Sequence, residues 1–161
     1  MEYSFAFSAR MIDSAECLFN SHADKEEAGR AILYLSCLSC EISMKALLEQ
    51  TGYTTKELRG FSHRLHELLD EISRCEHRKS NHRASSIRSK VVIEKTADGT
   101  VGTLLASQVG NASTYPNEIR YGEVVTHFPP VAMLNCARLV LRWCFENQGY
   151  LIRATSSIQT I

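Results

Sequence analysis

The feature that most constrains this chain is a long apolar stretch in its first third, KEEAGRAILYLSCLSCEISMKALLEQTG, residues 25–52. Apolar residues recur there every three or four positions, which is the period of an α-helix. One stripe is formed by Ala28, Ala31, Leu35, Leu38, Ile42 and Ala46, and it is widened by Ile32, Leu33, Leu47 and Leu48. Such a wide stripe predicts a central helix that other elements contact on several sides and that ends at Gly52.

Further segments with the same periodicity predict helices over residues 4–20, 55–76 and 129–147. Thr54 and Glu57 form a capping-box pattern at the start of the second of these segments. Pro129-Pro130 is typical of a helix start and opens the last one. The sequence therefore predicts an all-α fold, an antiparallel four-helix bundle, in a single domain over residues 1–161.

A different kind of segment separates the third and fourth predicted helices, over about residues 77–127. It overlaps a basic run, RCEHRKSNHRASSIRSK (74–90), and continues into VVIEKTADGTVGTLLASQV (91–109). The β-branched residues around Ala-Asp-Gly predict a β-hairpin. We therefore expect a mostly non-helical insertion before the last helix, and a polar, frayed tail over about residues 149–161.

Composition is that of an ordinary globular domain, with 44% hydrophobic and 22% charged residues. The 18 basic residues balance 18 acidic ones, so net charge argues neither for nor against a polyanionic partner. No apolar run approaches the ~18 residues that a membrane span needs, and the N-terminus MEYSFAFSARMIDSAE has no basic leader. We expect a cytoplasmic protein without a membrane contact.

The six cysteines raise the question of a metal site. Cys37 and Cys40 form a C-x-x-C motif, but inside the predicted central helix, and no second Cys or His pair follows at zinc spacing. His63 and His66 are three residues apart and lack a third ligand at a suitable spacing. We expect buried thiols in a reducing compartment, no metal and no cofactor.

Two sequence motifs lie on the second and third predicted helices. The first places an acidic residue and a lysine before a Leu-Leu pair: Glu41, Lys45, Leu47 and Leu48. The second, RGFSHRLHELLDEI, has a Gly before a His-x-Leu-x-x-Leu-Leu pattern: His63, Leu65, Leu68 and Leu69. Together with Arg120-Tyr121, these motifs resemble the HEPN family (higher eukaryotes and prokaryotes nucleotide-binding) over about residues 28–147.

The resemblance implies an all-α bundle that is often dimeric. Many HEPN members are metal-independent ribonucleases of toxin, abortive-infection or other defence systems, and others are non-catalytic modules or partners of a small nucleotidyltransferase. Catalytic members share an arginine followed, after four to six residues, by a histidine near the start of the last helix. Arg120 and His127 have six residues between them, so the resemblance implies that they are the candidate catalytic pair.

The chemistry of Arg120 and His127 suits RNA cleavage without a metal. A neutral histidine accepts the 2′-OH proton, and a guanidinium stabilises the charge that develops on the phosphate. The local sequence argues the other way, because GEVVTHFPP (122–130) opposes a regular helix and Tyr121 stands where active members carry a polar residue. In the competing interpretation, Arg120 or His63 pairs with Glu41, whose carboxylate is costly to bury alone.

Other polar residues are candidates for binding or for structural roles. The basic run contains possible phosphate contacts, with a solvated flexible loop as the alternative: Arg78, Lys79, Arg83 and Arg88. The run has no Phe, Tyr or Trp for base stacking, so we do not expect it to read RNA sequence alone. Lys45, four residues after Glu41, is the nearest structural partner of that carboxylate.

Two functions stay open at this point. The first is an RNA-binding or RNA-cleaving protein of a toxin–antitoxin or other defence system. The second is a non-catalytic dimerisation or adaptor module that binds nucleotide or another protein. The expected partners are a second copy of the chain, RNA, and a cognate antitoxin or nucleotidyltransferase.

Overall fold

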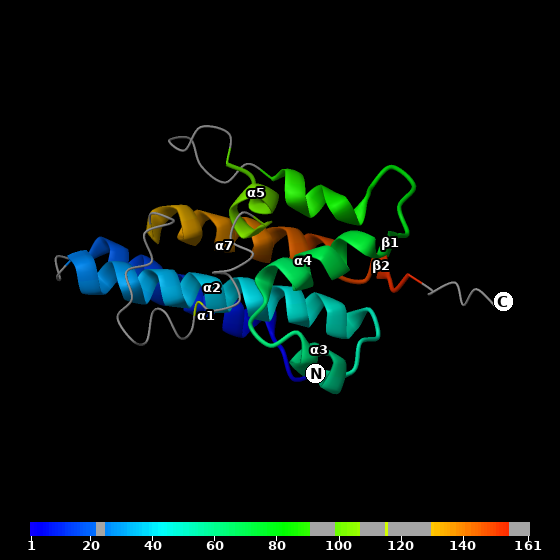
Figure 1. The fold of residues 1–161 in the computed structure, drawn as a ribbon, viewed down its shortest axis with the longest axis horizontal. Coiled ribbons are helices and arrows are strands. Elements are labelled where there is room, and N and C mark those ends of the chain that lie inside the picture. The colour runs from blue at the N-terminus through cyan, green and yellow to red at the C-terminus, as the bar shows by residue number, and fades with distance from the viewer. Residues whose placement is uncertain (22–24, 91–98, 107–114, 116–129, 155–161) are drawn as a thin grey trace.

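The computed structural model describes residues 1–21, 25–90, 99–106, 115 and 130–154, and the fold within them is mostly helical (Figure 1). The elements in chain order are α1 (Phe5–Asn20), α2 (Lys25–Gln50), α3 (Thr55–Gly60), α4 (Leu65–Arg74), β1 (Glu76–His77), the 3₁₀ helix η1 (Ala84–Ser89), α5 (Val101–Ala106), α7 (Pro130–Asn147) and β2 (Leu151–Ile152). Within these residues the predicted all-α class is confirmed, and a short two-stranded sheet lies beside the helices.

The central element is α2, as its wide apolar stripe predicts. It packs against α1, α7 and α4, and α1 also contacts α7. Figure 1 shows α2 along the length of the molecule, with α7 and α4 beside it. Fully buried side chains of α2 include Met44, Leu47 and Leu48. The helix ends at Gln50, and Gly52 just beyond it has a φ of 96°, the left-handed conformation that favours glycine.

The stretch Glu27–Gln50 of α2 is long and apolar enough to cross a membrane by length and composition. The sequence-based expectation that no stretch reaches this length is therefore wrong. In the fold, 78% of the most apolar window of this stretch is buried against other elements. This burial is expected of a central core helix.

The third predicted helix is in fact two helices, which corrects the continuous helix expected over residues 55–76. The predicted capping box of Thr54 and Glu57 is present, but α3 ends at Gly60. In the turn that follows, Ser62 has a φ of 51°, which is uncommon for a residue with a side chain. This turn brings the Ser62 carbonyl oxygen within 2.8 Å of Lys45 Nζ. The break thus serves a tertiary contact that helical periodicity does not reveal.

The β-hairpin predicted over residues 91–109 is wrong in its second arm, because Val101–Ala106 forms α5. The Thr100 side chain starts this helix by accepting a hydrogen bond from the Thr103 N–H at 3.0 Å. Strand propensity is a weak signal that tertiary packing overrides. The first arm, residues 91–98, lies outside the described residues.

The packing of α5 explains why a helix forms there. Val101 and Leu105 are buried, and α5 contacts η1 and α4. Gly102 lies so close to η1 that a Cβ atom would be 2.9 Å from the Arg88 carbonyl oxygen. The expectation that residues 77–127 are mostly non-helical is therefore wrong for η1 and α5, which form a small layer over α4.

The polar tail predicted from residue 149 onward is ordered at its start. Leu151–Ile152 forms β2, which pairs antiparallel with β1, and Leu151 is buried. Arg153 forms an ion pair of 2.7 Å with Glu57, and its guanidinium lies 4.1 Å from the centre of the Tyr53 ring. Backbone pairing, the burial of Leu151 and the contacts of Arg153 hold the described start of this tail.

Candidate functional site

A buried carboxylate, Glu41, lies in the middle of α2 with only 5% of its surface exposed. Lys45 follows one turn later and is 4% exposed. The Lys45 ammonium donates a hydrogen bond of 2.7 Å to Glu41 Oε1. The four-residue spacing places both side chains on one helix face, as the sequence indicates. Because both groups are removed from water, each charge depends on the other to stay buried.

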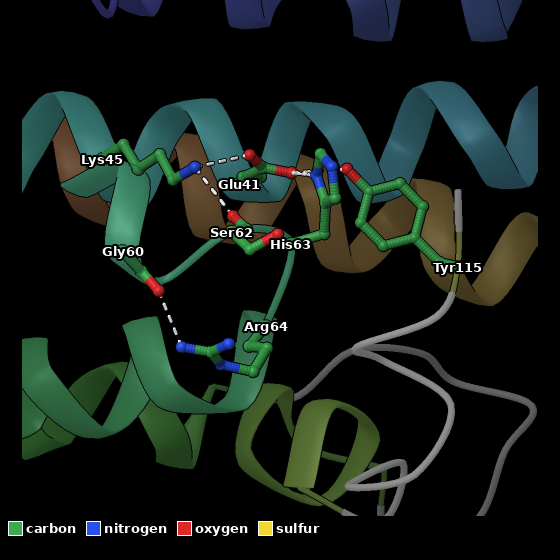
Figure 2. Close-up of polar contacts among 7 residues, drawn as sticks. All are labelled: Glu41, Lys45, Gly60, Ser62, His63, Arg64 and Tyr115. Atoms are coloured by element: carbon green, nitrogen blue, oxygen red, sulfur yellow. Dashed lines mark hydrogen bonds and ion pairs between the residues drawn. The ribbon is translucent and has the colours of Figure 1, made fainter. Parts of the chain in front are cut away.

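The second oxygen of the Glu41 carboxylate has two partners, and Figure 2 shows how they converge on it. His63, in the turn before α4, places Nδ1 2.9 Å from Oε2. The Tyr115 hydroxyl donates to the same oxygen at 2.6 Å. The rings of His63 and Tyr115 meet edge to face, with 5.7 Å between their centres. Among the described residues, the carboxylate thus has three side-chain partners, one of which, Lys45, is a cation.

The Lys45 ammonium completes the cluster on its other side. It donates a hydrogen bond of 2.8 Å to the Ser62 carbonyl oxygen and lies 5.5 Å from the centre of the Tyr3 ring. Arg64, next in the turn, donates to the Gly60 carbonyl oxygen at 2.7 Å (Figure 2). The cluster therefore ties α2 to the turn between α3 and α4 and to the N-terminal residues.

Tyr115 is held in its neutral form by this environment. Burial, followed by the nearby Glu41 charge, raises the pKa of the Tyr115 hydroxyl well above its usual range. A neutral phenol keeps its proton and acts as a donor to the carboxylate. In the sequence, Tyr115 stands five residues before Arg120, which lies outside the described residues.

His63 is the member of the cluster that reaches solvent, with 47% of its side chain exposed. Its Nδ1 faces Glu41, which leaves Nε2 on the solvent side. Among the residues that the structure describes, Nε2 has no hydrogen-bond partner. An imidazole oriented by a carboxylate can take up or release a proton at its other nitrogen. The contact of His63 with Glu41 confirms one of the two partners that the sequence-based interpretation offered for this carboxylate.

Arg120 and His127, the candidate catalytic pair, lie outside the described residues. Their roles as a phosphate contact and a proton acceptor therefore stay predictions.

The basic run is a folded part of the molecule, in contrast to the flexible loop weighed from its sequence. Arg78, Lys79 and Arg83 are exposed, yet their backbone is held by β1 and η1. The Arg78 N–H donates a hydrogen bond of 2.9 Å to the Tyr150 carbonyl oxygen. The Lys79 ammonium lies 3.9 Å from the centre of the Tyr150 ring. The fold thus presents these cations at defined positions.

Arg88 differs from the other predicted phosphate contacts. Its guanidinium forms an ion pair with Asp70 and donates from Nε to Ser73 Oγ at 2.9 Å. The side chain is only 34% exposed. Arg88 therefore joins η1 to α4, and its donors are largely occupied within the chain.

Aromatic rings stand beside the exposed cations, which the sequence of the basic run does not reveal. The His77 ring stacks on both the Tyr150 ring and the His82 ring. Tyr150 follows α7, far along the chain, and reaches His77 because β1 and β2 pair. Only the three-dimensional pairing brings this ring to the basic run.

The expectation of buried thiols is confirmed for five of the six cysteines and is wrong for Cys17, which is exposed. Cys37, Cys40 and Cys144 are buried in α2 and α7. Burial raises the pKa of the Cys37 and Cys144 thiols, and contact with the Cys136 thiol followed by burial raises that of Cys40. These thiols stay protonated and unreactive. Within the described part of the chain, no group of His, Cys, Asp and Glu is suited to hold a metal ion.

Comparison of the chain with family models, with curated proteins and with solved structures gives no match. The resemblance to HEPN proteins therefore rests on the motifs in the sequence alone.

Proposed function

We propose that this chain is an RNA-binding protein with a HEPN-like four-helix arrangement, acting in the cytoplasm as part of a toxin–antitoxin or other defence system. The observation that carries this proposal is the folded basic run. Residues 74–90 contain six Arg or Lys and one Glu, and the fold holds the exposed cations of this run in place.

The cations of the basic run differ in whether they have an acidic partner. Within the described residues, Arg78, Lys79 and Arg83 have no acidic partner, whereas Arg74 pairs with Glu71 and Arg88 with Asp70. A cation without an acidic partner in the chain gains most from a phosphate, because binding also releases counterions from the nucleic acid. We therefore assign phosphate contact to Arg78, Lys79 and Arg83.

A salt titration tests this assignment. Binding of an unstructured RNA oligonucleotide is measured by fluorescence anisotropy at several salt concentrations, for the wild type and for the triple variant Arg78→Ser, Lys79→Ser, Arg83→Ser. Each lost phosphate contact on a single strand removes about 0.7 from the slope of log affinity against log salt. We expect the slope to fall by about 2 in the triple variant.

The control for the salt titration removes the same charge from other exposed positions, with Arg10→Ser, Lys56→Ser and Arg142→Ser. We expect this variant to retain the wild-type slope. Equal slopes in the wild type and in the Arg78, Lys79 and Arg83 variant contradict the proposal, as does an absence of RNA binding.

RNA cleavage by Arg120 and His127 is the catalytic form of this proposal. The partners of Glu41 support it, because Lys45 gives that carboxylate a cation, which is the role that the competing interpretation offered to Arg120. RNA is incubated with the protein in the presence of a chelator. We expect His127→Ala and Arg120→Ala to abolish cleavage while melting at the wild-type temperature. Intact RNA with the wild type, or a strongly destabilised Arg120→Ala, would sink this form of the proposal.

A non-catalytic dimerisation or adaptor module is the second candidate function, favoured by a groove between α1 and α7. Apolar side chains line it, among them Phe5, Ile12, Leu141 and Phe145. Phe145 is 57% exposed, so this groove presents a large apolar side chain to solvent. Sedimentation of the wild type and of Phe145→Glu tests whether a second copy, an antitoxin or a nucleotidyltransferase covers this groove.

A further inference from the structure

Three rings form a column at the edge of the basic run. The centres of the Tyr150 and His77 rings are 5.9 Å apart with 11° between their planes. The centres of the His77 and His82 rings are 5.2 Å apart with 21° between their planes. Near-parallel rings at these separations are offset-stacked. Because His77 contacts both other rings, Tyr150 and His82 are the two ends of the column.

The middle ring of the column is fixed by hydrogen bonds. His77 Nδ1 accepts from the Lys79 N–H at 3.1 Å, and Nε2 lies 2.9 Å from Asn147 Oδ1. A nitrogen that accepts from an N–H carries no proton, so Nε2 is the donor to Asn147. The strand pairing and these bonds hold the column against α7.

The two ends of the column differ. At the Tyr150 end, the Lys79 ammonium lies over the ring. At the other end, His82 is exposed, and among the described residues only His77 is in ring contact with it. The column therefore has room for another flat ring on His82, and Arg83 follows directly in the sequence.

We infer that His82 is a stacking platform for one base of single-stranded RNA, whose flanking phosphates are contacted by Arg78 and Arg83. This inference rests on the proposed RNA binding and adds the strand state of the ligand. A base in a duplex is already stacked on both faces, whereas an unpaired base gains a stacking partner from His82. A stack of this kind is tolerant of sequence, because every base has a π-face.

The test compares single-stranded RNA with a duplex of the same length for the wild type, His82→Ala and the matched control Asn81→Ala. Base–aromatic stacking contributes about 1–3 kcal/mol per base by alanine substitution, and imidazole is at the lower end. We expect His82→Ala to weaken single-strand binding by about tenfold, with the salt slope and the duplex affinity unchanged. Asn81→Ala should bind both ligands as the wild type does.

A second variant keeps the test sharp. His82→Trp offers a larger ring, and the new indole should lose fluorescence when an unlabelled single strand stacks on it, while the native Trp143 is buried. Wild-type affinity in His82→Ala, equal affinity for single strand and duplex, or unchanged indole fluorescence would each overturn the stacking platform. If the Arg78, Lys79 and Arg83 variant still loses its salt slope, RNA binding stands and only the platform fails.

Discussion

Lys45 in α2 and Arg78 in the basic run carry the same charge in opposite settings. Lys45 is 4% exposed and donates to Glu41 and to the Ser62 carbonyl oxygen. Arg78 is exposed, and within the described chain its guanidinium has no acidic partner. A buried and partnered charge is needed to keep its neighbours folded, whereas an exposed cation contributes little to stability and is available to a ligand. Changes at the two regions should therefore separate stability from RNA binding.

The largest effect is expected when the buried pair is broken. Lys45→Met keeps the length of the side chain but leaves the Glu41 carboxylate without its cation, which should lower the free energy of unfolding by about 3–5 kcal/mol. Urea unfolding followed by circular dichroism measures this loss. Lys56→Met, at an exposed position of α3, is the control and should change stability little. Equal stability of the two variants would show that the Glu41 pair does not hold the fold.

A smaller effect is expected at Tyr115. Tyr115→Phe removes one donor from Glu41 and should cost about 2 kcal/mol, because Lys45 and His63 keep their contacts. Since the folded-state pKa of Tyr115 is raised, its contribution is complete below the unfolded pKa of about 10 and is lost as the pH rises above it.

Urea unfolding at several alkaline pH values checks the Tyr115 prediction. The wild type should lose more stability above pH ~10 than Tyr115→Phe does. Tyr150→Phe is the control, because its hydroxyl has no hydrogen bond among the described residues. At neutral pH, the Tyr150→Phe substitution should change the free energy of unfolding little. A cost as large as that of Tyr115→Phe contradicts the role of the Glu41 contact.

The cost of replacing Arg88 is expected to lie between the costs at Lys45 and at the exposed cations of the basic run. Its ion pair with Asp70 is partly exposed, so Arg88→Gln should cost about 1 kcal/mol, with Arg83→Gln as a nearly neutral comparison. A double-mutant cycle with Asp70→Asn isolates the contribution of the pair. A coupling energy of zero would mean that the ion pair contributes nothing to stability, as expected of an exposed cation.

The smallest effect on stability is expected from the triple variant Arg78→Ser, Lys79→Ser, Arg83→Ser. Surface substitutions of this kind change the free energy of unfolding by about 0.5 kcal/mol or less each. Thermal melting should thus be close to that of the wild type, although RNA binding is weakened. A large fall in the melting temperature would mean that these side chains support the fold.

Local patterns predicted the parts of the fold that local interactions determine. The apolar stripe of α2, the Thr54 capping box and the start of α7 at Pro130 could be read from neighbouring residues. The pairing of Glu41 with Lys45 follows from helical spacing for the same reason. These features need no knowledge of distant segments.

The remaining features depend on contacts between distant segments. The turn at Ser62 faces a lysine from another helix, and α5 forms against η1 where a hairpin was expected. The Glu41 contact with Tyr115 and the Tyr150 ring beside His77 join residues far apart in the sequence. No periodicity or motif encodes such pairings in a single sequence.

The pairing of β1 with β2 has a consequence for the order in which the molecule folds. Its two-residue register joins Glu76 to Ile152 and His77 to Leu151, so it closes a very long stretch of chain with few backbone bonds. The entropy of that closure is offset only once α2 and α7 have packed. The ring column and the cations beside it are therefore expected to form late in folding and to be lost early in unfolding. Nascent or partly unfolded chains would therefore lack the surface that we propose for RNA.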